Sequence, residues 1–106
     1  MVAIMKTAWD EYLDRAGPER RIQILSWYNL RPPAVQAMVR EYPPGTAFEV
    51  NGRQAWVVSY VEPDEDGQGA GYSLSYVDPA VNYHGALMAR FFVHADCLKA
   101  DGVCVH

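Results

Sequence analysis

The segment FEVNGRQAWVVSYV, at positions 48–61, constrains the fold more than any other part of the chain. Two runs rich in β-branched and aromatic residues flank Asn51 and Gly52, the pair that most readily takes positive φ at both centres of a type I′ turn. The segment therefore predicts a β-hairpin closed by a two-residue turn. Any fold for this chain has to contain that antiparallel pair.

The turn also predicts the register of the hairpin and the faces of its strands. Counted outward from the turn, one face carries three cross-strand pairs: Val50 with Arg53, Phe48 with Ala55, and Thr46 with Val57. The opposite face carries Ala47, Glu49, Trp56, Val58 and Tyr60. Because both faces become apolar along the second strand, we expect that strand to be central in its sheet, covered by helices or closed into a small barrel.

Helical and strand signals are segregated along the chain. Residues 7–42 show helical periodicity, residues 46–95 read mainly as strands, and YPPGT at 42–46 separates the two halves. This order predicts an α+β fold and not alternating βαβ units. Two or three N-terminal helices are expected to pack on a small antiparallel sheet or barrel.

The length of 106 residues fits a single domain, 1–106. Half of the residues are hydrophobic, which is enough apolar surface to form a core. We expect a helical part at 1–42, an antiparallel β part at 43–99 and a tail at 100–106.

The helical part contains its own start and stop signals. Thr7 is a candidate N-cap with Asp10 in the capping-box position, and Gly17 with Pro18 ends this helix and begins the next. The second helix has a wide apolar face, so we expect it to pack on two sides. That face consists of Ile22, Ile24, Leu25, Trp27 and Tyr28. After the break at LRPP, helical spacing predicts a buried stripe of Val35, Met38, Val39 and Tyr42.

Two further strands are predicted in the β part. YSLSYV at 72–77 alternates large apolar residues with serine, which predicts a half-exposed strand, and RFFVHA at 90–95 predicts the last strand. EPDEDGQGAG at 62–71 is typical of a solvated acidic loop. The connection at 79–89 is either a short helix or a long loop.

A resemblance rests on the strand pattern of residues 43–95. The Pro-Pro-Gly-Thr entry, the Asn-Gly hairpin, the long strand WVVSYV and the later strands YSLSYV and RFFVH together resemble the small SH3-like barrels found in many unrelated modules. Such barrels bind peptides, proteins or nucleic acid and rarely catalyse, so the resemblance implies a binding function. The whole chain also resembles the short orphan products of bacteriophages and mobile gene cassettes.

The charge of the chain argues against general nucleic-acid binding. Nine Lys and Arg stand against 13 Asp and Glu, a formal charge of -4, whereas nucleic-acid modules usually carry a basic excess. The first residues lack the apolar core of a signal peptide, and no apolar run approaches the ~20 residues that cross a bilayer. We therefore expect a cytoplasmic protein with no membrane partner, in which Cys97 and Cys104 stay reduced.

The segment HADCLKADGVCVH, residues 94–106, holds both cysteines and two histidines. His94, Cys97, Cys104 and His106 contain the ligand atoms that zinc prefers, but the two cysteines are too far apart for a zinc knuckle. We therefore expect no metal and no cofactor. A catalytic thiol would need Cys97 to pair with His94 or with a histidine outside this segment, and no glycine-rich oxyanion turn accompanies it.

The favoured function is the binding of another protein without catalysis. The predicted contact residues are Tyr72 and Tyr76, with Glu62, Asp64 and Asp66 at the rim. Tyrosine is common at interfaces, and exposed carboxylates attract basic partners. A domain of this kind would serve as an adaptor or inhibitor encoded by a phage or mobile element. A homodimer is also open, because an exposed strand edge can pair with a second copy.

Two alternatives from other classes stay open. The first is a small ligand-binding protein or enzyme with a pocket between the helices and the sheet. Its candidate residues are His84, His94 and Cys97. The second is a nucleic-acid-binding barrel. Its candidate residues are Arg20, Arg21 and Arg31.

Overall fold

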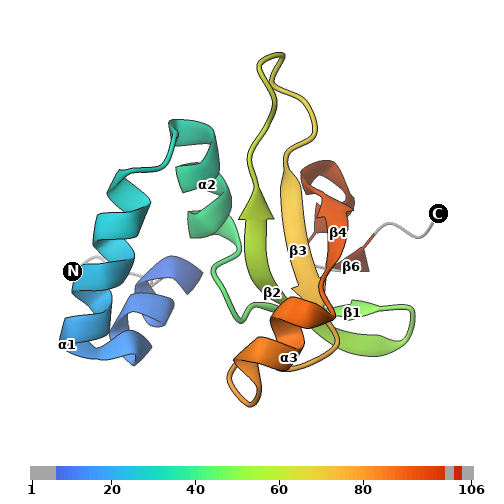
Figure 1. Ribbon diagram of the computed structural model, residues 1–106, viewed down its shortest axis with the longest axis horizontal. Helices are drawn as coiled ribbons and strands as arrows, with labels where there is room; N and C mark the ends of the chain where they lie inside the picture. The colour runs from blue at the N-terminus through green and yellow to red at the C-terminus, as the bar shows by residue number, and fades with distance from the viewer. Residues whose placement is uncertain (1–6, 100–101, 104–106) are drawn as a thin grey trace, which may run out of the picture. The chain divides into compact units, whose positions relative to one another are not determined.

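The computed structural model describes residues 7–99 and 102–103, which form helices followed by antiparallel strands (Figure 1). The fold is α+β, as the segregated signals predicted. The chain divides into two compact units, Met1–Pro43 and Pro44–His106. The division falls inside the YPPGT segment, because neither a helix nor a central strand continues easily through adjacent prolines.

The first helix, α1 (Ala8–Asn29), begins at the predicted capping box. The hydroxyl of Thr7 accepts the amide N–H of Asp10 at 3.2 Å, and the Asp10 carboxylate accepts the amide N–H of Thr7 at 3.2 Å. Two N–H groups that the helix itself leaves unpaired are thereby satisfied. The prediction of this cap is confirmed.

A sharp bend at Gly17 divides α1 into two parts. Gly17 has φ 81° and ψ 167°, a combination that residues with a Cβ rarely adopt, and Pro18 starts the second part. The second part turns back, so that the Tyr28 ring lies 5.0 Å from the Trp9 ring. Arg21 also reaches back, donating its Nε–H to a carbonyl of the first part at 3.3 Å. The predicted break is confirmed.

The second helix, α2 (Pro33–Glu41), follows a short turn. Three of its apolar residues, Val35, Met38 and Val39, are buried at the predicted helical spacing. The Gln36 side chain donates to the carbonyl of Tyr28 at 3.1 Å, which ties α2 to the end of α1.

The prediction that the second part of α1 packs on two sides is wrong. Ile24 is buried, whereas Ile22 and Trp27 from the predicted apolar face, and Leu30 beyond it, are exposed. The guanidinium of Arg31 lies 5.2 Å from the centre of the Trp27 ring. This cation–π contact gives the ring a polar neighbour at the surface, so the apolar composition of this face does not require a second covering layer.

The second unit is built around a four-stranded antiparallel sheet in chain order. Its strands are β1 (Ala47–Val50), β2 (Arg53–Val61), β3 (Gly71–Ser75) and β4 (Phe91–His94). The hairpin of β1 and β2 has the predicted register, with Val50 opposite Arg53 and Phe48 opposite Ala55. Asn51 and Gly52 have φ of 52° and 77°, as the type I′ turn requires.

A β-bulge at Val58 corrects one part of the predicted pattern. Val57 lies opposite Leu74, but the next pair is Ser59 with Ser73, so Val58 has no residue opposite it. Because of this extra residue, the side chains of β2 that follow Val58 point to the face opposite to the one that simple alternation predicts. Tyr60 therefore shares the face of Val57, and not that of Trp56 as simple alternation predicted.

Strand β3 is buried along its whole length, so the prediction of a half-exposed strand is wrong. The small size of the serine side chains explains why β3 is buried on both faces. Ser75 lies opposite Trp56, and Ser73 lies opposite Phe92 on the other neighbouring strand. A serine is too small to be buried by its own contacts, and the larger aromatic residues opposite it on the adjacent strands account for its burial.

The remaining elements follow β3 and β4. The helix α3 (Tyr83–Met88) occupies part of the connection that the sequence left open as a helix or a loop. After β4 come the 3-10 helix η1 (Ala95–Cys97) and the strands β5 (Leu98–Lys99) and β6 (Gly102–Val103), which pair with each other. Strand β6 lies beside β1. No helix in residues 7–99 and 102–103 is long and apolar enough to span a membrane.

Replacing Gly17 with alanine is expected to lower the free energy of unfolding by about 1–3 kcal/mol, because a Cβ is strained at this φ and ψ. Urea unfolding followed by tryptophan fluorescence measures the change. Ser26→Ala, at an exposed helical position, is the control and is expected to stay within about 0.5 kcal/mol of the wild type. A Gly17→Ala protein as stable as the control would contradict the bend.

Gly71→Ala is expected to destabilise the sheet by about 1–3 kcal/mol through overpacking. A Cβ at Gly71 would collide with the Phe92 ring and the carbonyl oxygen of Val93. Ser73→Ala, on the same strand, adds no volume and is the matched control. Equal unfolding midpoints for these two variants in urea would show that the Phe92 ring does not cover Gly71.

Candidate protein-interaction surface

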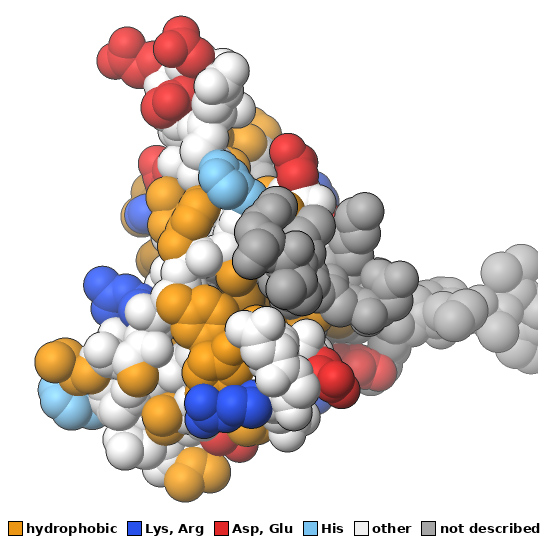
Figure 2. All heavy atoms as spheres, turned by 90° about the vertical axis from the view of Figure 1, so that its right-hand side faces the viewer, with side chains coloured by type: hydrophobic (Ala, Val, Ile, Leu, Met, Phe, Trp, Pro, Cys, Tyr) orange, Lys and Arg blue, Asp and Glu red, His pale blue; other side chains and the backbone are white. Residues whose placement is uncertain are grey.

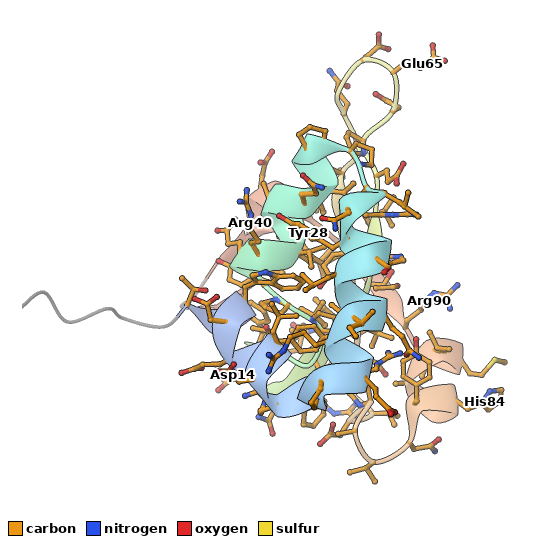
Figure 3. The ribbon with its side chains drawn as sticks, turned by 90° about the vertical axis from the view of Figure 1, so that its left-hand side faces the viewer. Asp14, Tyr28, Arg40, Glu65, His84 and Arg90 are labelled. Carbon is orange, nitrogen blue, oxygen red and sulfur yellow. The ribbon has the colours of Figure 1, made fainter. Side chains whose placement is uncertain are left out.

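The loop between β2 and β3 presents the acidic residues predicted for the rim of a binding site. Glu62, Asp64, Glu65 and Asp66 are exposed, and Figure 2 shows acidic side chains gathered at its tip. Figure 3 shows Glu65 at that tip, pointing away from the strands. The loop therefore offers negative charge to the surroundings.

Asp64 also holds the loop in shape. Its Oδ1 accepts the amide N–H groups of Asp66 at 3.0 Å and Gln68 at 2.9 Å. Its own amide N–H donates to the carbonyl of Gln68 at 2.7 Å. Asp64 is thus a loop-forming residue as well as a surface charge, whereas Glu65 and Asp66 lie on the loop that it organises.

The two tyrosines predicted as contact residues occupy different environments. Tyr72 is 2% exposed, and its ring packs edge to face on Tyr60 with the centroids 5.6 Å apart. Tyr76 is half-buried; its ring lies 4.9 Å from the Phe91 ring and 4.1 Å from the guanidinium carbon of Arg53. Tyr72 is therefore a core residue, and only Tyr76 is partly open to solvent.

The acidic loop and Tyr76 lie at opposite ends of β3. The loop leads into the strand at Gly71, and Tyr76 follows its last residue, Ser75. The structure therefore does not bring the predicted residues together into one surface. Tyr76 instead lies at the start of the segment that leads from β3 to α3.

The segment around α3 exposes the apolar surface that the sequence did not identify. Val81, Tyr83 and Met88 are 83%, 60% and 76% exposed; these three residues are called the α3 surface below. The helix also contains Ala86, which is fully buried and fixes α3 to the rest of the β unit. In the sequence, these apolar residues stand in the connection at 79–89, which has no regular periodicity. Their exposure could therefore not be predicted from the sequence.

Short-range hydrogen bonds hold the α3 surface in place. The Asp78 carboxylate accepts the amide N–H of Ala80 at 2.9 Å, and the Asp78 carbonyl accepts that of Val81 at 3.0 Å. The Asn82 side chain caps α3 by accepting the amide N–H of Gly85 at 2.9 Å. An exposed apolar segment is thus built on an ordered turn and cap.

The histidines and cysteines are spread over several elements. His84 is exposed on α3, His94 is exposed on β4, and Cys97 is half-buried in η1. In the described part of the chain, no three His, Cys, Asp or Glu residues form a group that could hold a metal ion. Cys104 and His106 lie outside the described residues, so the four-residue zinc candidate is not tested.

The arginines proposed for nucleic-acid binding make contacts inside the helical unit. Arg20 donates to the side chain of Gln23 at 3.0 Å. Arg21 lies 3.7 Å from the Asp14 carboxylate, and Arg31 donates to the carbonyl of Trp27 at 3.3 Å. These contacts give each arginine a structural role that does not depend on phosphate.

Comparisons of the chain with protein-family models, with curated proteins and with solved structures find no significant match. The resemblance to SH3-like barrels therefore stays a prediction.

Asp64→Ala is expected to speed hydrogen exchange at the amides of Asp66 and Gln68 by on the order of tenfold, because both lose their acceptor. NMR exchange measurements on the full chain test this. Glu65→Ala removes the same charge from the same loop without removing the acceptor, so it is the matched control. Equal exchange in the two variants would show that Asp64 does not order the loop.

Proposed function

We propose that this protein is a non-enzymatic protein-binding domain and that it contacts its partner through the α3 surface. The exposure of Val81, Tyr83 and Met88 within one short segment carries this proposal. Large apolar side chains gain free energy when they leave water, so the exposure of several of them in one short segment favours a contact site.

The side chains of the α3 surface suit a groove in another protein. Tyrosine supplies a rigid ring with a polar tip, and methionine fills irregular apolar spaces. Ordered backbone on both sides of Val81 keeps the loss of conformational entropy on binding small. A partner with an apolar groove that accepts Tyr83 and Met88 fits this chemistry.

The barrel architecture, the cytoplasmic location and the phage or mobile-element origin that the sequence suggested are part of this proposal. The β unit is proposed to be a small SH3-like barrel, and the position of β6 beside β1 supports closure of the sheet at that edge. The adaptor or inhibitor is proposed to act in the cytoplasm and to be encoded by a phage or mobile element.

Affinity capture with the purified chain tests the proposal. The double variant Tyr83→Ser with Met88→Ser is expected to lose at least tenfold of the partner captured from a bacterial lysate, as measured by quantitative mass spectrometry. A tenfold loss corresponds to about 1.4 kcal/mol, less than the apolar burial of two such side chains provides.

A second double variant controls for loss of exposed apolar surface in general. Ile22→Ser with Leu30→Ser changes two exposed apolar residues of the helical unit and is expected to capture the same partner as the wild type. Equal loss in both double variants, or no protein retained by the wild type, would refute binding through the α3 surface.

A further inference from the structure

The turn of the β1–β2 hairpin contains the one asparagine of the chain that is followed by glycine. The other two, Asn29 and Asn82, are followed by leucine and tyrosine. The side chain of an asparagine is an amide, and the main-chain nitrogen of the next residue can attack its Cγ. A glycine hinders this attack least, because it has no side chain beside the nitrogen. Asn51 and Gly52 are therefore a chemically reactive pair as well as a suitable turn.

The structure leaves both reacting groups open to water. Asn51 and Gly52 are exposed, and Figure 1 shows their turn at the free end of the hairpin. Apart from its neighbours in the chain, nothing lies within 4 Å of the position that a Cβ on Gly52 would take. Among the described residues, the amide N–H of Gly52 has no main-chain acceptor. The attacking nitrogen is thus not held by another group.

The other two asparagines are held by hydrogen bonds. The nitrogen that would attack Asn29 belongs to Leu30, and its N–H donates to the carbonyl of Trp27 at 3.2 Å. The side chain of Asn82 accepts the amide N–H of Gly85 at 2.9 Å, which fixes it in the cap of α3. A larger side chain also follows each of them. The structure therefore favours Asn51 over both.

The acidic loop contains a related pair, Asp66 and Gly67. The amide N–H of Gly67 donates to the carbonyl of Asp64 at 2.9 Å, so this nitrogen is engaged. A carboxylate also resists attack at its carbon, because it carries a negative charge and has no neutral leaving group. This pair is therefore expected to react more slowly than the pair in the hairpin turn.

We propose that Asn51 is a site of spontaneous deamidation. The nitrogen of Gly52 forms a bond to Cγ of Asn51, and the side-chain amide leaves as ammonia with the proton from that nitrogen. A five-membered succinimide ring remains. Water then opens the ring at one of its two carbonyls. Overall one water is consumed and one ammonia is released, and no group is oxidised or reduced.

The position at which water attacks determines the product. Attack at Cγ gives an ordinary aspartate at residue 51. Attack at the main-chain carbonyl gives isoaspartate, in which the chain continues through Cβ and Cγ and the α-carboxylate is free. Aspartate followed by glycine suits a type I′ turn, so the first product keeps the hairpin. Isoaspartate adds one carbon atom to the main chain of the turn.

The closed turn opposes the first step of this reaction. Asn51 has φ 52°, and in a type I′ turn the first central residue has ψ of about 30°. At this ψ the nitrogen of Gly52 points away from the Cβ of Asn51, so the ring closes only after the turn has opened. Local opening is easiest where few buried contacts oppose it. The frequency of opening therefore limits the rate of deamidation.

The isoaspartyl product cannot restore the original pairing. The two-residue turn places Val50 opposite Arg53 and Phe48 opposite Ala55, and a longer main chain in the turn no longer fits that register. Phe48 and Val50 are 6% and 8% exposed, so a shift of β1 removes two side chains from the core. Each deamidation to isoaspartate therefore leaves a lasting change in a hairpin that had opened.

This inference does not depend on the proposed function, because it uses none of the residues of the α3 surface. The full chain is incubated at mildly alkaline pH, where the attacking nitrogen loses its proton more readily. Trypsin then cleaves after Arg40 and Arg53 and releases residues 41–53, in which Asn51 is the only asparagine. Mass spectrometry measures the replacement of NH₂ by OH, and a protein isoaspartyl methyltransferase labels the isoaspartyl product.

The folded chain is expected to convert Asn51 while Asn29 and Asn82 stay unchanged. The same chain unfolded in urea is expected to convert Asn51 faster, because the turn no longer opposes ring closure. Val50→Ala removes a buried contact next to the turn and leaves the reactive pair intact, so it is expected to raise the rate in the folded chain severalfold.

Two variants of Asn51 separate the isoaspartyl linkage from the added charge. Asn51→Gly has no side-chain amide and keeps a turn of two glycines, so its urea unfolding midpoint is expected to stay constant during the incubation. Asn51→Asp carries the charge of the ordinary product and is expected to unfold like the fresh wild type. The incubated wild type is expected to gain an isoaspartyl fraction that unfolds at lower urea.

Three results would overturn the inference. The first is a folded chain in which Asn51 stays intact for as long as the unfolded chain needs for complete conversion. The second is an equal rate in the folded and the unfolded chain, which would show that the turn does not oppose the reaction. The third is an isoaspartyl fraction with the unfolding midpoint of the fresh wild type.

Discussion

The positive φ angles at Asn51 and Gly52 set the register on which the whole sheet depends. They place Val50 opposite Arg53, and the pairing then runs along β2 without a shift as far as Val57. Strand β3 takes its register from β2, and β4 takes its register from β3. A different turn would shift β1 against β2 by at least one residue, and a shift by one residue exchanges the two faces of a strand.

The influence of the hairpin turn on the faces of β2 ends at the bulge at Val58. The turn determines which residues face the core only up to the bulge, and beyond it Tyr60 joins the opposite set. This change brings Tyr60 onto Tyr72, and the two rings pack edge to face. The core beneath the acidic loop therefore depends on one extra residue in β2, whereas the exposed end of the hairpin depends on the turn.

Local signals in the sequence predicted those parts of the fold that are determined within a few residues. The capping box of Thr7 and Asp10, the break at Gly17 and the hairpin turn each follow from neighbours in the chain. The α+β class followed from the order of helical and strand segments. These features could be predicted because the physical cause and its effect lie in the same short segment.

The features that the sequence did not reveal depend on residues far apart in the chain. Burial of Ser73 and Ser75 requires rings from β2 and β4 on either side. The place of Tyr72 in the core likewise depends on Tyr60, so a tyrosine-rich strand could not be assigned to a surface from its own alternation. The exposure of Tyr83 and Met88 depends on which side of α3 carries the buried Ala86, and a helix of six residues is too short for its buried side to be predicted from periodicity.

The chain order of the sheet has a consequence for how the protein folds. Each strand of the sheet pairs with the one before it, so the sheet can assemble by adding one hairpin at a time. Closing the β1–β2 turn orders very few residues, while β3 and β4 are joined by the much longer segment that includes α3. Because the entropy lost in closing a loop grows with its length, the joining of β4 carries the largest loop-closure cost of the three strand pairings in this sheet.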